Sequence, residues 1–425
     1  MNVADDAEPR ATSSASLLGW LAEGSPAARR ALLAASLGWG LDAFDVMLYA
    51  FVLTTLLTHF SITTTTAGLL GSLTLIASGL GGLLFGALAD RFGRRPALIV
   101  SILVYSVFTA ACGLSQTIWQ LGVFRFLLGL GMGGEWTAGA AMVSETWPDR
   151  HRGKAVAIMQ SSWAVGYAAA ALVAAFVLPT FGWRAVFFVG LAPALLTLWI
   201  RRGVEESELW RSSKDTPADA SRATAREVFL GRFARTTALL TLLSTATIFA
   251  YWGLNQWVPA YLELPPERGG LGFGNALKTT LVVAMQVGTF FGYVSFGYVA
   301  DAIGRRKTFV SYILLAAALT LVYASLENPW LLLAIGPLVA FFGTGFFSGF
   351  AAVTAEIYPT SVRAIAQGFT FNVGRFGSAA APFIVGSVAQ TSGFGVAFAM
   401  LAGALLLGAA TWIWLPETRG RGVAT

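Results

Sequence analysis

The chain has 425 residues, of which 56% are hydrophobic and only 12% are charged, against roughly 25% charged residues in soluble proteins. This composition excludes a soluble multidomain protein and predicts a chain that crosses a membrane many times. The net charge of +6 does not indicate a nucleic-acid partner, because the basic residues fall between apolar runs. Cys112 is the only cysteine, which excludes an internal disulfide and a thiolate metal cluster.

Residues 1–28 are polar and lack the basic start and apolar core of a signal peptide, so we expect a cytoplasmic tail. Apolar runs then follow in close succession. Because a backbone in lipid must satisfy its own hydrogen bonds, each run is expected to be a helix. The twelve predicted spans are 31–57, 67–89, 97–114, 118–143, 155–178, 183–200, 236–262, 276–300, 308–325, 331–355, 365–389 and 394–415.

A charged, Ser/Thr/Ala-rich loop at 201–235 divides these helices into two sets of six. The predicted fold is therefore an all-α membrane protein with two six-helix bundles, at 29–200 and 236–415. A short C-terminal tail, 416–425, is expected to be cytoplasmic.

The distribution of Lys and Arg predicts the orientation of the chain in the membrane. Most of the 28 basic residues precede the first span or follow an even-numbered one, and only a few lie in the alternate loops. The positive-inside rule then places both termini in the cytoplasm. The chain has no Asn-x-Ser/Thr acceptor for glycosylation, which fits a bacterial inner membrane.

The two halves repeat one another at an offset of 211 residues. Residues 86–95 and 297–306 both read Gly-x-x-Ala-Asp-x-x-Gly-Arg-Arg, and 145–152 and 356–363 both read Glu-x-x-Pro-x-x-x-Arg. Near the first helix of each half, Trp-Gly-Leu-Asp at 39–42 matches Trp-Gly-Leu-Asn at 252–255. A repeat of this kind predicts a carrier whose binding site lies between the halves, near the middle of the membrane.

The repeated loop at 86–95 resembles the signature of the major facilitator superfamily, and the resemblance covers nearly the whole chain from residue 31. Within that superfamily, the segments 41–45, 131–136 and 145–152 resemble the sialate:proton symporter and monocarboxylate permease group. The ending at 416–420 also resembles sugar porters. The fifth helix lacks the Gly-Pro signature of drug:proton antiporters, which disfavours drug export.

Asp42 and Asp45 are the first candidates for proton coupling. They share a face of the first helix with Tyr49, and they lie about 18 and 22 Å from its cytoplasmic end if it begins near Arg30. Two close carboxylates in a low-dielectric interior do not both stay ionised, so one is expected to hold a proton. The alternative is a structural hydrogen-bonding role for one of them.

Arg375 lies at a similar depth in the other half, about 16 Å into the eleventh helix. Its planar guanidinium suits a carboxylate substrate, although a fixed salt bridge between the halves is the alternative. Further candidates for substrate contact are Tyr49, Asn255, Gln256 and Asn372.

Arg125 and Glu135 are the other charges that lie well inside a predicted span. They are about 15 Å apart along the fourth helix, so they cannot pair directly. The resemblance implies a role for Arg125 near the first helix, in structure or in a proton relay. Glu135 is either a second proton site or a buried structural residue.

The repeated loop motifs place two sets of charges at the cytoplasmic face. The resemblance implies that these residues are gating latches between helices, which break when the inner gate opens. They are Asp90, Arg94, Glu145 and Arg152 in one half, and Asp301, Arg305, Glu356 and Arg363 in the other. No metal cluster, phosphate loop or nucleophile triad is visible in the sequence, so neither an enzyme nor a cofactor is expected.

Together these features predict a proton-coupled symporter of a small organic anion, such as lactate, pyruvate or sialic acid, that works as a monomer in the lipid bilayer. Symport of a sugar or another metabolite is the alternative within the same class. A transporter-like nutrient sensor is the alternative from another class, and it would bind its ligand without turnover.

Overall fold

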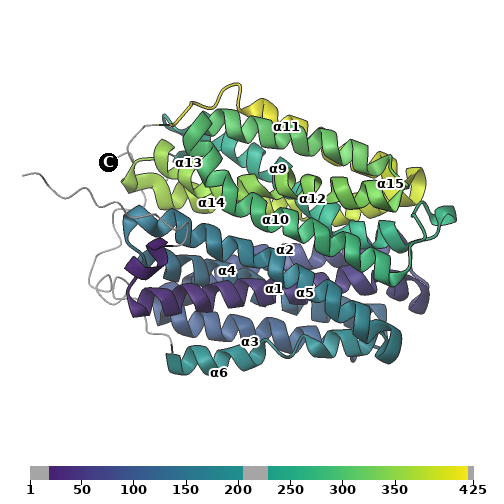
Figure 1. Cartoon of the computed structure of the whole chain (residues 1–425). Coiled ribbons are helices and arrows are strands. Elements are labelled where there is room, and N and C mark those ends of the chain that lie inside the picture. Colours follow the sequence, from purple (N-terminus) through teal and green to yellow (C-terminus); the bar gives the residue numbers. More distant parts are fainter. Residues whose placement is uncertain (1–18, 204–227, 420–425) are drawn as a thin grey trace, which may run out of the picture.

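The computed structural model describes residues 19–203 and 228–419, and these contain helices but no strand. The N-terminal unit consists of η1 Gly19–Glu23, α1 Pro26–His59, α2 Thr64–Phe92, α3 Arg94–Cys112, α4 Ile118–Thr146, α5 Asp149–Val189 and α6 Ala194–Gly203. The C-terminal unit consists of α9 Ala234–Glu263, η3 Pro266–Arg268, α10 Asn275–Ile303, α11 Arg305–Ala324, α12 Pro329–Gly345, η4 Phe346–Gly349, α13 Phe350–Ile357, α14 Thr360–Ser378 and α15 Ala381–Thr411. Figure 1 shows the two units side by side, with their helices roughly parallel.

The described helices account for the twelve predicted membrane crossings. Among the described residues, nine helical stretches are long and apolar enough to cross a membrane. Two of them, His151–Ile200 and Ala366–Thr411, have 50 and 46 residues, and each contains a glycine with positive φ near its middle. A span needs about 20 residues, so each stretch holds two crossings. The charged helix α4 adds the twelfth.

The sequence repeat is also a repeat of backbone geometry. Gly93 and Gly304, at corresponding positions between α2 and α3 and between α10 and α11, have φ of 112° and 101°. Gly182 and Gly393, which turn the chain within α5 and α15, have φ of 76° and 83°. All four backbones lie in a region that L-residues with a side chain rarely adopt. The structure therefore confirms two six-helix bundles with matching turns.

Replacement of Gly93 by alanine is expected to destabilise the protein by about 1–3 kcal/mol, because its backbone conformation is nearly exclusive to glycine. Gly86, in the neighbouring helix, is the matched control, since a Cβ there would meet no described atom within 4 Å. Gly86→Ala should therefore be neutral or slightly stabilising. The apparent unfolding temperature in detergent measures both, and equal effects of the two variants would contradict the prediction.

Helix α1 begins at Pro26, earlier than the predicted start at residue 31. Ser25 caps it by accepting a hydrogen bond from the Ala28 amide at 3.0 Å, and proline suits the first helical turn. Just before it, Trp20 of η1 is buried against Trp147, with ring centroids 5.0 Å apart. Part of the predicted N-terminal tail thus packs on the helix bundle.

The outward faces of the helices expose large apolar side chains, as the composition predicts for a membrane protein. Leu83, Phe176 and Phe291 are 58%, 75% and 57% exposed. Trp119 and Trp330, near the starts of α4 and α12, are 83% and 77% exposed, as in the aromatic belts at membrane surfaces. The chain is therefore a multi-pass membrane protein.

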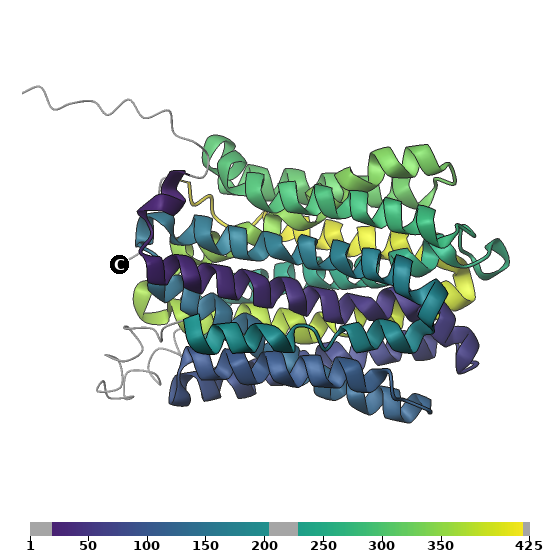
Figure 2. The same ribbon diagram turned by 60° about the horizontal axis from the view of Figure 1, so that its bottom comes forward.

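Both ends of the described chain lie at the same end of the molecule, which we call the terminal end (Figures 1 and 2). Hydrogen bonds between the two units gather toward the opposite end. They join Thr54 to Glu263 at 2.7 Å, Thr64 to the Gly386 carbonyl at 2.8 Å, Thr65 to Gln390 at 2.7 Å, and Asn275 to the Ala175 carbonyl at 3.0 Å. These bonds hold the units together at the end opposite the termini.

Candidate functional site

A cluster of buried charges lies where the two units meet. Asp42 of α1 and Glu135 of α4 are 1% and 0% exposed, and Arg375 of α14 is 4% exposed. The guanidinium of Arg375 is close enough to interact electrostatically with both carboxylates. The cluster therefore combines two acids from the N-terminal unit with one base from the C-terminal unit.

The charges of this cluster are incompletely paired. Within the described part of the chain, neither oxygen of Asp42 or Glu135 has a hydrogen-bond partner, and one terminal nitrogen of Arg375 also lacks one. No direct ion pair forms among these three described residues. Buried charges without partners are costly, and they mark sites where protons or ligands bind.

Glu135 reaches the cluster because α1 has a glycine at the contact. A Cβ added to Gly38 would lie 2.6 Å from the Glu135 carboxylate oxygen Oε1. A larger residue at position 38 would push the carboxylate away. Glu135 was predicted as a candidate, but its electrostatic interaction with Asp42 was not, since the approach of the two carboxylates depends on how α1 and α4 pack.

Asp45 has a different environment from Asp42, although both lie on α1. Its Oδ2 accepts a hydrogen bond from Thr109 of α3 at 3.1 Å. It is 1% exposed and lies inside the N-terminal unit, next to Gly190. The structure therefore brings Asp42, and not Asp45, to the arginine of the other unit.

Arg125 and Tyr49 form a separate pair within the N-terminal unit. The Arg125 guanidinium carbon lies 3.7 Å from the centroid of the Tyr49 ring, a cation–π contact. Its Nε donates to the Leu70 carbonyl at 3.4 Å, and the Tyr49 hydroxyl donates to the Ala67 carbonyl at 2.8 Å. Tyr49 and Arg125 therefore contact each other rather than Arg375.

The remaining predicted contact residues lie along the interface between the units. Asn372 of α14 is half-buried, and its Oδ1 faces Gly82 of α2. Gln256 packs on Gly71, also of α2. The Asn255 carbonyl accepts a hydrogen bond from the Tyr167 hydroxyl of the other unit at 2.6 Å.

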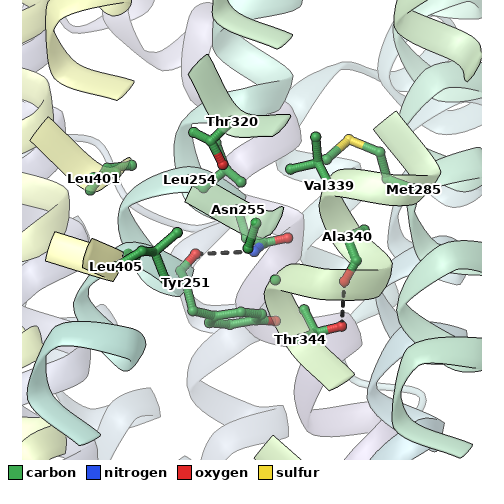
Figure 3. A pocket seen from close by; sticks show the side chains of 13 residues that line it. Tyr251, Leu254, Asn255, Met285, Thr320, Val339, Ala340, Thr344, Leu401 and Leu405 are labelled. Carbon is green, nitrogen blue, oxygen red and sulfur yellow. Dashed lines mark hydrogen bonds between the residues drawn. The ribbon is translucent and has the colours of Figure 1, made fainter. Parts of the chain in front are cut away.

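A small cavity of about 20 Å³ lies beside Asn255 within the C-terminal unit (Figure 3). It is lined by residues of α9, α10, α11, α12 and α15, among them Tyr251, Asn255 and Thr320. A cavity of this size holds about one water molecule. It is too small for an organic substrate in this conformation.

The charges predicted as gating latches come together as two matching triads at the terminal end. Arg94 pairs with Asp90 and with Glu145 of α4, at 2.5 and 3.0 Å. At the corresponding positions, Arg305 pairs with Asp301 and, at 3.0 Å, with Glu356. Each triad lies within a single unit. The other two predicted members, Arg152 and Arg363, follow Glu145 and Glu356 in the sequence, and Arg363 donates to the Tyr358 carbonyl at 3.2 Å.

Glu417 strengthens the second triad, and the sequence analysis did not assign it a role. Its carboxylate accepts hydrogen bonds from the backbone amides of Arg305 and Arg306, at the start of α11. Burial alone would raise the pKa of Glu417, but these and two further backbone amides outweigh burial and hold the pKa below its usual value. Glu206, its counterpart in the sequence repeat, lies outside the described residues.

Lys278, near the start of α10, is a buried charge to which the sequence patterns assign no role. Its side chain is 0% exposed. Its ammonium pairs with Glu263 at 2.9 Å, and Thr54 of the other unit donates to the same carboxylate oxygen at 2.7 Å. This ion pair therefore supports the contact between the units at the end opposite the termini.

Loss of this ion pair is expected to destabilise the protein. Lys278→Ala removes the cation beside Glu263, which is 26% exposed and keeps its hydrogen bond from Thr54, so we expect a loss of about 1–3 kcal/mol. The double variant Lys278→Met/Glu263→Gln should recover most of the loss. Thermal unfolding in detergent measures both, with Lys307→Ala at an exposed lysine as the control. A double variant no more stable than Lys278→Ala would argue against a paired interaction.

The fold and the buried charges between two repeated units define a class of protein, the polytopic membrane transporter. Comparison with protein-family models identifies the family. The model of the Major Facilitator Superfamily matches residues 35–274 and 264–424. The chain therefore belongs to the Major Facilitator Superfamily, as the loop motifs predicted, and it is a transporter rather than an enzyme.

Relatives along almost the whole chain are bacterial transport proteins. A protein of Haemophilus influenzae whose name assigns it to metabolite transport is 35% identical, over 92% of this chain and 97% of its own. A protein of Cupriavidus pinatubonensis whose name assigns it to 4-methylmuconolactone transport is 34% identical, over 95% and 94%. A sialic acid transporter of Escherichia coli is 33% identical, over 89% and 91%.

The solved structures confirm the fold. The crystal structure of a D-xylose–proton symporter superposes with a TM-score of 0.77, and the match covers 92% of this chain and 98% of that one. The two sequences are only 20% identical, so this similarity concerns the fold alone.

Proposed function

We propose that the protein is a secondary active transporter that moves a small organic anion together with one or more protons by alternating access. The observation that carries this proposal is the cluster of Asp42, Glu135 and Arg375, which is buried between the units and incompletely paired. A proton and an anion are the two ligands that would complete it.

The acids of the cluster supply the proposed proton site. Asp42 and Glu135 lie close enough to interact with each other, and two carboxylates so placed favour holding a proton between them. Asp45 is kept as a second candidate because one of its oxygens has no partner among the described atoms. Arg125 takes a supporting role, since it contacts Tyr49 rather than the cluster.

Arg375 supplies the proposed substrate site. Its guanidinium binds a carboxylate through two parallel hydrogen bonds, and one of its terminal nitrogens is available in this conformation. Asn372, one turn earlier on α14, together with Asn255 and Gln256 of α9, would contact the rest of the substrate as the units close around it. Sialic acid, the substrate named for one relative, is itself a carboxylic acid.

The triads at the terminal end fit a gating role. Arg94 and Arg305 each tie the start of one helix to a carboxylate on another, and such ties must rearrange if the helices move at this end. We place the terminal end in the cytoplasm, because most of the basic residues lie at that end. We place the protein in a bacterial inner membrane. A monomer contains both units and therefore the complete site.

Uptake into proteoliposomes tests the proposal. Labelled lactate, pyruvate, sialic acid and glucose are offered with and without an inward proton gradient. Acid uptake that rises with the gradient supports proton-coupled transport of an anion. Uptake that does not depend on the proton gradient would overturn the proposed proton coupling. Uptake of glucose and of none of the acids would overturn the proposed substrate class in favour of sugar symport.

A further inference from the structure

Two buried indole N–H groups at the interface between the units lack hydrogen-bond partners. Trp39 of α1 and Trp163 of α5 are 8% and 3% exposed, and their ring centroids are 4.6 Å apart. The Trp39 Nε1 has no acceptor among the described residues, and the Trp163 Nε1 has only the nearby Tyr251 hydroxyl, which interacts with it but does not reach normal hydrogen-bond geometry. Because buried donors in proteins are nearly always bonded, these two N–H groups are open to an acceptor from outside the chain, either water or a ligand.

The position of this tryptophan pair links it to the charge cluster. Trp39 lies three residues before Asp42 and shares its face of α1, and Asp42 is one of the carboxylates that interact with Arg375. Trp163 contacts the other unit, with its ring centroid 6.4 Å from Tyr251 and 5.9 Å from Trp252. The pair therefore lies at the same interface as the charges.

The pair also neighbours the cavity. Tyr251, which contacts Trp163, lines the small cavity beside Asn255 (Figure 3). As the units move, this is where space for a ligand can open next to the indole groups. The flat rings of Trp163, Tyr251 and Trp252 come from both units and offer faces and edges to a planar ligand.

We propose that the indole N–H groups of Trp39 and Trp163 donate hydrogen bonds to an acceptor on the body of the substrate, whose carboxylate is held by Arg375. This rests on the proposed transport of an organic anion and narrows its class. The substrate is a carboxylic acid that carries a second acceptor, a keto or hydroxyl oxygen or a ring nitrogen, on a compact skeleton. A site built to donate hydrogen bonds rejects analogues without the acceptor, because its buried donors are then left unpaired.

Binding to matched pairs of acids tests the inference. Pyruvate and propanoate differ by one oxygen acceptor, and pyridine-3-carboxylate and benzoate differ by one ring nitrogen. N-acetylneuraminate, which carries several acceptors, is titrated alongside. Dissociation constants are measured by calorimetry on purified wild-type protein and on Trp39→Phe and Trp163→Phe, which keep an aromatic ring but lose the donor. Trp412→Phe is the matched control, because Trp412 also has a buried, unpaired indole N–H among the described residues, but it packs on Phe309 within the C-terminal unit.

The wild-type protein should bind at least one of the acids that carry a second acceptor, namely pyruvate, pyridine-3-carboxylate or N-acetylneuraminate. Where a pair binds, its acceptor-bearing member is expected to bind about tenfold more tightly, which corresponds to one hydrogen bond of about 1.4 kcal/mol. Trp39→Phe and Trp163→Phe should weaken binding of the acceptor-bearing acid by that factor. The affinity for its matched partner should stay unchanged. Trp412→Phe should change neither.

Unchanged affinity for the acceptor-bearing acid in both tryptophan variants would overturn the inference, and water would then be the partner of the indole groups. Acid binding without preference in the wild type would also overturn it, while leaving the proposed function intact. If no acid binds, the proposed function and the inference both fail. If a variant does not fold, indole ¹⁵N-labelled wild type replaces it. Two of the 14 indole resonances should then shift on addition of the acceptor-bearing acid and stay in place with its partner.

Discussion

Asp42→Asn is expected to abolish proton-driven accumulation of the substrate while preserving exchange. One coupled proton sustains about tenfold accumulation of an anion for each pH unit of gradient, since both correspond to about 1.4 kcal/mol. Asparagine resembles the protonated acid but cannot release the proton, so the accumulation ratio should fall to about one. Counterflow exchange of labelled for unlabelled substrate, which needs no proton release, should continue.

The structure distinguishes the two aspartates of α1 and so provides the control. Asp45 already accepts a hydrogen bond from Thr109 and does not interact with Arg375. Asp45→Asn should therefore accumulate substrate nearly as well as wild type. If Asp42→Asn still concentrates substrate and Glu135→Gln does not, the proton site is Glu135. If Asp42→Asn, Glu135→Gln and Asp45→Asn all still concentrate substrate, the proposed coupling is wrong.

Patterns along the chain were sufficient to predict the twelve helices and the repeat, because each depends on local sequence, and the Asp–Arg part of each triad lies within one loop motif. A span is an apolar run of sufficient length, and a loop motif brings its own charges together. Arg94 and Asp90, for example, are four residues apart on either side of the turn at Gly93, and Arg305 and Asp301 repeat this arrangement at Gly304. The same reasoning placed Asp42 and Arg375 at similar depths.

Contacts that depend on helix packing could not be predicted in this way. Glu135 meets Asp42 only because α4 approaches α1 at Gly38. Lys278 lies at the start of α10 and Glu263 at the end of α9, so only the tertiary structure shows that the buried lysine pairs with this carboxylate. Depth along a helix is readable from sequence, whereas the direction of a side chain around it depends on neighbours that sequence periodicity does not identify.

The repeat shows how one fold divides two tasks between its halves. At the offset of 211 residues, the position of Glu135 is taken by Phe346 in the C-terminal unit, and the position of Arg375 is taken by Ala164 in the N-terminal unit. Near the first helix of each unit, where the offset is 213 residues, Asp42 corresponds to Asn255. The acids of the charge cluster therefore lie in one unit and its base in the other, so movement of the units relative to each other would change the distance between the proposed proton site and the proposed anion site.

Arg375→Gln is expected to weaken binding of the transported acid at least 30-fold. Removal of one partner from a buried charge pair costs about 2–5 kcal/mol, and each 1.4 kcal/mol is a factor of ten in Kd. Arg375→Lys should fall between wild type and Arg375→Gln, because lysine keeps the charge but loses the fork that matches a carboxylate. Calorimetric titration with the acid identified in the uptake assay measures the affinities.

Arg125→Gln is the control for this prediction, since Arg125 is equally buried but packs on Tyr49 within the N-terminal unit. It should lower the unfolding temperature and leave the affinity for the acid within about threefold of wild type, because it lies away from the charge cluster. If Arg375→Gln binds the acid as tightly as wild type, the arginine is a fixed structural charge. The carboxylate of the substrate would then need another partner, and Lys278, the other fully buried basic side chain of the C-terminal unit among the described residues, would be the first to test.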